Sequence, residues 1–123
     1  MSHSYFQILQ DDSVQIIELA LPPDVDPLVL DRVIQETTQA VVDRPGAPWV
    51  LDMGKVRYLN SAGLGLLCNI REKIRKSGGH LVLCNMAPML AQLFRSCCLE
   101  KLFTISKSRP DAVAAARKQA KVK

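Results

Sequence analysis

Two runs of hydrophobic residues at the start of the chain predict a β-hairpin. The first is Tyr5–Leu9, and the second, Val14–Leu21, is the richer in Val, Ile and Leu. Residues 10–13 between them are all polar, which is typical of a turn. The two runs are therefore expected to pair as antiparallel strands.

A helix is predicted next, because the hydrophobic residues change to helical spacing. Asp26 and Pro27 are typical of an N-cap and of a first helical residue. The apolar stripe that follows comprises Leu30, Ile34, Thr37 and Val41, with Val33 beside it. The helix is expected to end at Arg44-Pro45-Gly46.

The middle of the chain predicts a strand, a helix and a second strand. Trp49–Met53 and Leu81–Cys84 are short, nearly continuous apolar runs, as expected of strands covered on both faces. The helix between them spans Ser61–Lys76 and ends at Ser77-Gly78-Gly79. Its apolar stripe comprises Gly63, Leu67, Ile70 and Ile74. A crossover of this length places the two strands parallel.

The last third of the chain predicts a helix, a short strand and a final helix. The first helix covers residues 88–98, and we expect Met89, Leu93 and Cys97 on its inner face. The strand is Leu102–Ile105, and the final helix runs from Pro110 to Ala120. The whole pattern predicts one α/β domain over residues 1–123, frayed after about residue 120, in which about four helices pack against a mixed sheet of four to five strands.

Composition supports a packed domain and excludes a membrane protein. Of the 123 residues, 48% are hydrophobic and 23% are charged, which is the balance of a globular domain. No apolar run approaches the ~20 residues that cross a bilayer. The N-terminus lacks the basic segment and long apolar core of a signal peptide. We therefore expect a cytoplasmic protein with no direct membrane insertion.

The four cysteines do not form a metal or redox motif. They are Cys68, Cys84, Cys97 and Cys98, with no C-x-x-C pair, and the chain contains only two histidines. Each cysteine lies within an apolar pattern, where a free thiol behaves as a small hydrophobe. Their positions predict reduced thiols in or near the core, with no metal and no cofactor.

The net charge of +4 arises mainly from two basic clusters. One is the C-terminal tail, and the other comprises Arg71, Lys73, Arg75 and Lys76 on one predicted helix. Aromatic residues make up only 5% of the chain, so a base-stacking surface is not evident. A solvated helix face and a solvated tail account for the charge, and no nucleic-acid partner is expected.

The segment from Asp52 to Gly65 carries the strongest functional signal. Its two glycines, Gly63 and Gly65, each cost the predicted helix about 1 kcal/mol relative to alanine, which indicates close packing or backbone left open to another surface. Ser61 is either an ordinary helix cap or, if Asn60 is the cap, the first helical residue. The alternative role for Ser61 is phosphate acceptor, because a helix N-terminus stabilises the added charge.

Catalysis by this segment is not expected. It lacks the G-x-S-x-G pattern of a nucleophilic serine, and no histidine is near Ser61 in the sequence. His80 starts the next strand, on the opposite side of the crossover, and Asp52 alone cannot organise a triad. The glycines at 63 and 65 lack the remainder of a dinucleotide fingerprint or a phosphate-binding lysine loop. We therefore expect a protein that is not an enzyme.

The same segment resembles the signature of STAS domains, which occur in bacterial anti-sigma factor antagonists and in the tails of sulfate transporters. The residues that carry the resemblance are Val50–Met53, Val56, Tyr58–Leu59 and Asn60–Leu64. Further similarity lies in Ser77–Gly79, Leu93-Phe94 and Leu99–Ile105, so it extends over nearly the whole chain. The resemblance implies an α/β, STAS-like fold.

The resemblance also implies a phosphorylation switch. In the antagonist branch, the serine matching Ser61 is phosphorylated by an anti-sigma factor that is also a serine protein kinase. The unphosphorylated form binds that kinase and releases a sigma factor or another output, and a PP2C-type phosphatase restores the serine. The implied partner-binding residues are Asn60, Ser61, Ala62, Gly63 and Leu64. Leu64 lies off the predicted buried stripe, so we expect it to be exposed.

Three positions depart from the family pattern. Asn60 replaces a frequent aspartate and so removes a charge beside the acceptor, the hairpin exit is Leu21–Asp24, and Cys98 stands where a glycine is common. An alternative that the family implies is a cytoplasmic docking subunit of a membrane transport system. Threonine is common at the acceptor position in that class, so Ser61 favours the switch.

Overall fold

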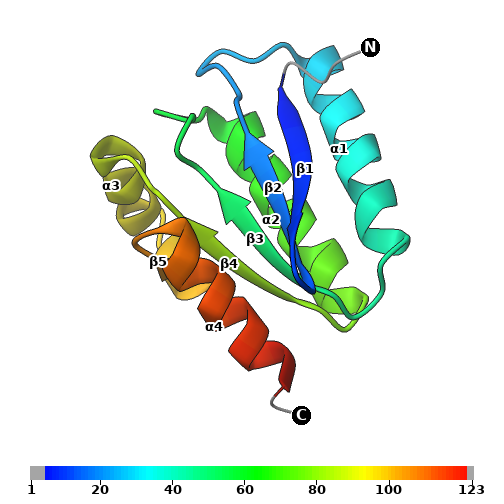
Figure 1. The fold of residues 1–123 in the computed structure, drawn as a ribbon. Coiled ribbons are helices and arrows are strands. Elements are labelled where there is room, and N and C mark those ends of the chain that lie inside the picture. Colours follow the sequence, from blue (N-terminus) through cyan, green and yellow to red (C-terminus); the bar gives the residue numbers. More distant parts are fainter. Residues whose placement is uncertain (1–4, 122–123) are drawn as a thin grey trace.

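The computed structural model describes residues 5–121 and shows a central sheet with helices on both faces (Figure 1). Within that range the strands are β1 (Phe6–Asp11), β2 (Val14–Leu19), β3 (Pro48–Asp52), β4 (His80–Cys84) and β5 (Thr104–Ser106). The helices are α1 (Pro27–Val42), α2 (Ser61–Lys76), α3 (Pro88–Ser96) and α4 (Arg109–Lys121), with a short 3-10 helix, η1 (Leu99–Lys101), before β5. The predicted α/β fold with a mixed sheet is confirmed.

The strands lie in the sheet in chain order, β1-β2-β3-β4-β5. β1 and β2 pair antiparallel, as the hairpin pattern predicts, whereas the other neighbouring pairs are parallel. In this register Glu18 of β2 lies opposite Asp52 of β3, and Asp52 lies opposite Cys84 of β4. The carboxyl ends of these three strands therefore meet at the edge where the loop to α2 begins.

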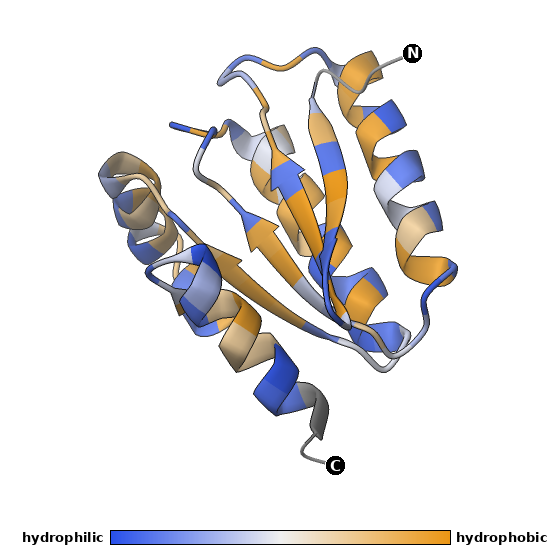
Figure 2. Ribbon diagram, viewed as in Figure 1, coloured by the Kyte–Doolittle hydropathy of each residue, from blue (hydrophilic) through white to orange (hydrophobic). Residues whose placement is uncertain are grey.

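Two apolar clusters stabilise the sheet, one on each face. The larger contains residues of α1, α2 and α3 together with alternate strand residues such as Trp49 and Leu51. The smaller lies under α4 and includes Val50, Val82 and Ala112. Every residue of β3 is buried, because helices cover both faces of this central strand, as its continuous apolar run predicts. Figure 2 shows the hydrophobic positions concentrated on the strands and on the helix faces next to them.

The predicted inner face of α3 is wrong for Met89 and Cys97 and confirmed in part for Leu93, which is half-buried against the larger apolar cluster. Leu90 and Phe94 are the buried residues of α3, whereas Met89 is 66% exposed and Cys97 is exposed. The ring of Phe94 packs against Phe103 with 5.6 Å between centroids. The predicted stripe and the stripe of Leu90 and Phe94 have the same four-residue spacing. Burial of the large aromatic ring of Phe94 decides which stripe faces the core. The helix also ends at Ser96, two residues earlier than predicted.

The cysteine prediction is confirmed for two residues and wrong for the other two. Cys84 is buried and Cys68 is half-buried, whereas Cys97 and Cys98 are exposed. Cys97 and Cys98 lie beyond the last residue of α3, so the helix does not direct their side chains towards the core. Burial raises the pKa of the Cys84 thiol to about 12, which makes it a neutral core group.

The backbone of Cys98 is left-handed, with φ 58° and ψ 24°. This conformation costs a residue with a Cβ about 1 kcal/mol relative to glycine, which explains a preference for glycine there. We expect Cys98→Gly to raise the free energy of unfolding by about 1 kcal/mol in urea denaturation. The matched control is Cys97→Gly, because Cys97 has φ −95° and gains no relief from strain. Equal stabilisation by both substitutions would contradict this explanation.

The last strand and helix begin at different residues from those predicted. β5 is Thr104–Ser106, and α4 begins at Arg109 and continues to Lys121. Ser108 precedes the helix, and its side-chain oxygen accepts a hydrogen bond from the Asp111 amide at 3.3 Å. Arg109 is therefore the first residue of α4, at its end near the carboxyl ends of the parallel strands. The predicted fraying after about residue 120 falls partly on residues outside the described range.

Candidate functional site

The loop between β3 and α2 follows a path held by buried side chains. Met53, Val56 and Leu59 are each at most 1% exposed. The Met53 amide donates to the Cys84 carbonyl at 2.9 Å, and the Val56 amide donates to the Met53 carbonyl at 3.0 Å. The loop is thus anchored to the core on one side and presents Tyr58 to solvent on the other.

Asn60, not Ser61, is the N-cap of α2. Its side-chain oxygen accepts a hydrogen bond from the Gly63 amide at 2.8 Å, and its backbone is extended. Ser61 is consequently the first residue of the helix, and it is exposed. The structure therefore selects between the two caps that the sequence left open, and it leaves the Ser61 hydroxyl free of the capping role.

The implied partner-binding residues differ in exposure. Ala62 is exposed beside Ser61, whereas Gly63 is buried. A Cβ at Gly63 would lie 2.8 Å from Leu59 Cδ2 and 3.2 Å from Leu59 Cβ, so this glycine permits close packing of the loop. Leu64 is half-buried against the larger apolar cluster, so the prediction that it is exposed is wrong in part. The first turn of α2 is therefore only partly open to solvent, because Leu59 of the preceding loop packs against Gly63.

Residues of α3 extend the exposed surface next to the loop. Tyr58, which is 39% exposed, lines a shallow groove with Met89, Gln92, Leu93 and Ser96. Hydrophobic spacing does not indicate this contribution, because it predicts Met89 on the buried side of α3. In the structure Met89 is the large apolar side chain of α3 that is open to solvent.

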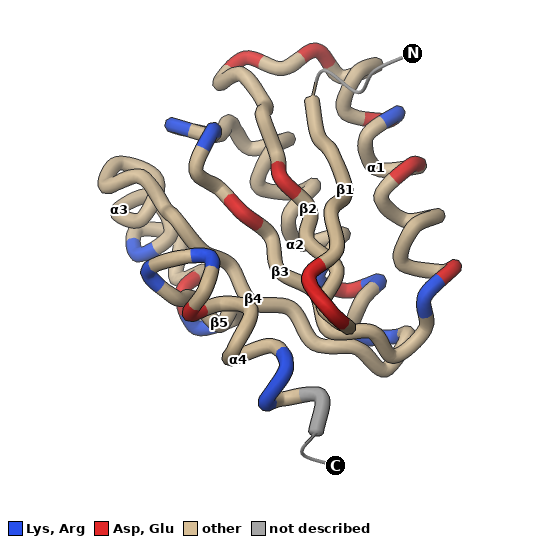
Figure 3. Tube along the Cα trace, in the orientation of Figure 1, with Lys and Arg blue, Asp and Glu red and all other residues tan. Residues whose placement is uncertain are grey.

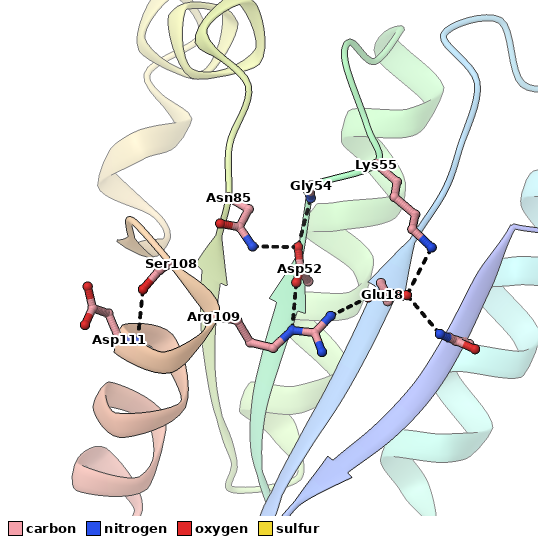
Figure 4. A network of polar contacts seen from close by, with 9 residues as sticks. Glu18, Asp52, Gly54, Lys55, Asn85, Ser108, Arg109 and Asp111 are labelled. Atoms are coloured by element: carbon pink, nitrogen blue, oxygen red, sulfur yellow. Dashed lines mark hydrogen bonds and ion pairs between the residues drawn. The ribbon is translucent and has the colours of Figure 1, made fainter.

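A polar network lies at the carboxyl ends of β2 and β3, centred on Asp52, which is 5% exposed (Figure 4). One oxygen, Oδ1, accepts from the Gly54 amide at 2.9 Å and from Asn85 Nδ2 at 3.1 Å. The other, Oδ2, accepts from Arg109 Nε at 2.8 Å. One carboxylate therefore joins the loop after β3, the residue after β4 and the start of α4.

Arg109 extends the network to a second carboxylate. Its Nη2 donates to Glu18 Oε2, while Glu18 Oε1 accepts from Lys55 Nζ at 3.3 Å and from Gln7 Nε2 at 2.9 Å. Figure 3 shows the acidic positions inside β2 and β3 and the basic positions on the loop beyond β3. The sequence did not indicate this network, because Arg109 lies 57 positions from Asp52.

The network favours the charged forms of its members. Burial by itself raises the pKa of Asp52, but hydrogen bonds from Gly54, Asn85 and Arg109 outweigh it and hold that pKa below its usual value. The hydrogen bond from Gln7 is the largest influence on Glu18, and the pKa of Glu18 is also lowered. Both carboxylates are therefore ionised at neutral pH, opposite a charged Arg109.

The described residues do not assemble a nucleophilic triad around Ser61. His80 pairs with Pro48 at the start of β3, at the end of the sheet opposite to the loop that leads to Ser61. Between residues 5 and 121, no group of three or more His, Cys, Asp or Glu side chains is placed to hold a metal ion. Over the same range, the helices are too short or too polar to cross a membrane.

Comparison with known proteins places the chain in a family. The STAS domain family matches residues 7–112. A curated relative, the putative anti-sigma factor antagonist BtrV of Bordetella bronchiseptica, is 36% identical over 76 residues, which is 62% of this chain and 66% of the relative. The match therefore spans slightly less than two thirds of that relative's length.

Solved structures show the same fold. An anti-sigma factor antagonist from Mycobacterium paratuberculosis has a TM-score of 0.75 at 24% identity, covering 91% of this chain and 92% of that one. Moorella thermoacetica RsbS with a serine-to-glutamate substitution has a TM-score of 0.81 at 15% identity, covering 97% and 100%. The phosphorylated form of the Bacillus cell fate determinant SpoIIAA has a TM-score of 0.65 at 15% identity, covering 89% and 97%.

The family match covers most of the chain, and the solved relatives share its fold. The resemblance drawn from the segment around Ser61 is thereby confirmed: this chain belongs to the STAS domain family.

Proposed function

We propose that this protein is an anti-sigma factor antagonist that works as a phosphorylation switch at Ser61. The unphosphorylated form binds an anti-sigma factor that is also a serine protein kinase, and so releases a sigma factor or another output. Phosphorylation of Ser61 ends that binding, and a PP2C-type phosphatase restores it. The observation that carries the proposal is the exposed Ser61 at the start of α2, with Asn60 serving as the cap.

The surroundings of Ser61 support its role as phosphate acceptor. As the first residue of α2, it lies where backbone amides have no partner within the helix, and these amides and the helix dipole attract an anion. The first turn of α2 contains no acidic residue that would repel a phosphate. A phosphate of about −1.5 to −2 charge can therefore be accommodated there without unfolding the domain.

The proposed binding surface combines two segments. One consists of Asn60, Ser61, Ala62, Gly63 and Leu64, in which Gly63 acts by allowing close packing and Leu64 contributes only its exposed part. The other is the exposed edge of α3 at Met89, next to Tyr58. A kinase that covers this surface excludes water from Ser61. An unpaired phosphate buried in such a contact is strongly unfavourable, which gives the switch its direction.

The descriptions of two relatives support this role. BtrV is described as a putative anti-sigma factor antagonist, and SpoIIAA has a phosphorylated form. The docking role in a membrane transport system is the alternative, and it requires no phosphate on Ser61. A test of phosphorylation therefore separates the two functions.

The direct test is to incubate the full chain with ATP and the serine kinases of its host that resemble histidine kinases. Mass spectrometry then locates any phosphate. We expect one phosphate per chain, on Ser61, and its removal by a PP2C-type phosphatase. The internal controls are the other serines on the surface, such as Ser13 and Ser96, which are expected to remain unlabelled. Absence of label under conditions in which a kinase binds tightly would overturn the switch and favour docking.

A further inference from the structure

Two loops at the carboxyl end of the sheet and the helix on its other face converge on one carboxylate. We propose that Arg109 is a positioning residue that, through Asp52, sets the conformation of the loop leading to Ser61, so that α4 controls how readily Ser61 is bound and phosphorylated. The coupling between Arg109 and the loop is a property of the free protein. Its effect on phosphorylation rests on the proposed function.

The division of contacts between the two oxygens of Asp52 supports this coupling. Oδ1 serves the loops, through the Gly54 amide and Asn85, whereas Arg109 is the hydrogen-bond donor to Oδ2. Asp52 is 5% exposed, so solvent cannot readily replace the guanidinium. Loss of Arg109 leaves a buried, charged oxygen without its partner, and the carboxylate must turn towards another donor or water. That movement disturbs Oδ1 as well.

The loop has little room to absorb such a movement. A Cβ on Gly54 would lie 3.1 Å from Asp52 Oδ1 and 3.5 Å from Asn85 Cβ, so the loop backbone packs directly on the carboxylate. Asn85 itself has φ 59°, a left-handed conformation in which its amide reaches Asp52. A shift of Asp52 is therefore transmitted to both segments bordering the proposed binding surface.

Arg109 also reaches the loop by a second route. Its other contact, Glu18, accepts from Lys55, which follows Gly54 in the loop. The Lys55 side chain is 63% exposed, so this ion pair is screened by water and contributes little. Asp52 is therefore the main connection, and Glu18 mainly fixes the orientation of the guanidinium.

A purely stabilising role for the network makes a different prediction. Met53, Val56 and Leu59 already anchor the loop in the core. If the network added only overall stability, loss of Arg109 would speed hydrogen exchange of all core amides by the same factor. Coupling predicts an effect confined to the amides that depend on Asp52. Hydrogen exchange measured residue by residue distinguishes these roles.

The first arm of the test compares R109Q with R117Q by NMR hydrogen exchange in the free full-length protein. Arg117 lies on the same helix but pairs at 3.7 and 3.8 Å with Asp11 and Asp12, at the hairpin turn. In R109Q we expect the Gly54 amide to exchange about tenfold faster relative to the Met53 amide, which bonds to Cys84. In R117Q this ratio stays at its wild-type value. An unchanged ratio in R109Q overturns the coupling.

The second arm measures phosphorylation by the kinase that labels wild-type Ser61. We expect R109Q to lower kcat/KM about tenfold and R117Q to leave it within about twofold. G54A, which presses on the same carboxylate from the loop, is expected to act in the direction of R109Q. Normal phosphorylation of R109Q, despite faster exchange at Gly54, overturns the control by α4. If no kinase labels the wild type, the proposed function fails, while the exchange ratio still decides the coupling.

Discussion

Replacing Ser61 with glutamate is expected to weaken binding to the kinase partner about a hundredfold or more, whereas Ser61→Ala leaves binding within about threefold. Ser61 is exposed at the start of α2, so alanine removes only a hydroxyl from the surface. Glutamate introduces a charge that the complex must desolvate without a matched partner, which costs several kcal/mol. The dissociation constant, measured by titration calorimetry with the purified kinase, checks both expectations.

Folding is not expected to change in the same direction as binding. A carboxylate at the first position of α2 is favoured by the helix dipole, and Asn60 continues to cap the helix. Ser61→Glu should therefore melt at or slightly above the wild-type temperature while it loses binding. A matched control is Ser13→Glu in the exposed turn between β1 and β2, which makes the same substitution at the end of the sheet opposite to Ser61. Loss of binding in this control would show a non-specific effect of charge.

The pair of Ser61 variants also separates the switch from the docking alternative. A docking module requires no phosphate on Ser61, and a partner whose contact leaves Ser61 uncovered binds the wild type and both variants alike. Equal affinity of wild type, Ser61→Ala and Ser61→Glu for a partner that binds tightly would therefore contradict the switch.

Gly79→Ala is expected to lower the free energy of unfolding by about 2–3 kcal/mol. A Cβ at Gly79 would lie 2.4 Å from the Ala47 carbonyl oxygen and 3.2 Å from Ile74 Cγ2. The nearest atom belongs to the backbone leading into β3, so relief requires a shift of the main chain where β3 and β4 begin. Gly79 does not have a positive φ, so the cost is steric rather than conformational. Urea denaturation, with the midpoint and slope fitted together, measures it.

The matched control for this substitution is Gly65→Ala in α2. Nothing lies within 4 Å of a Cβ at Gly65, and the residue is exposed. The greater helix propensity of alanine should raise the free energy of unfolding by about 0.5–1 kcal/mol. Two glycine-to-alanine changes are thus expected to have opposite signs. Destabilisation by Gly65→Ala would indicate that its conformation, not its packing, is required.

Elements with a strong local pattern were predicted well. α2 spans Ser61–Lys76, as its stripe and final glycines indicated, and β3 is buried along its whole length. These elements combine a clear period with clear ends, so local propensity and burial point to the same structure. The face of α3 was predicted wrongly at Met89 and Cys97 because two apolar stripes compete in one short helix, and packing against Phe103 selects Phe94.

The sequence by itself determined the α/β fold and the family, and it pointed to Ser61 as the phosphate acceptor that we propose, because each depends on residues that are neighbours along the chain. Only the tertiary structure decided that Asn60 is the cap, that Met89 is open to solvent, and that Arg109 reaches Asp52. The last contact joins residues 57 positions apart through parallel strand pairing and the placement of α4. Hydrophobic periodicity specifies which face of an element is buried, but it carries no information about which polar groups then meet at the sheet edge.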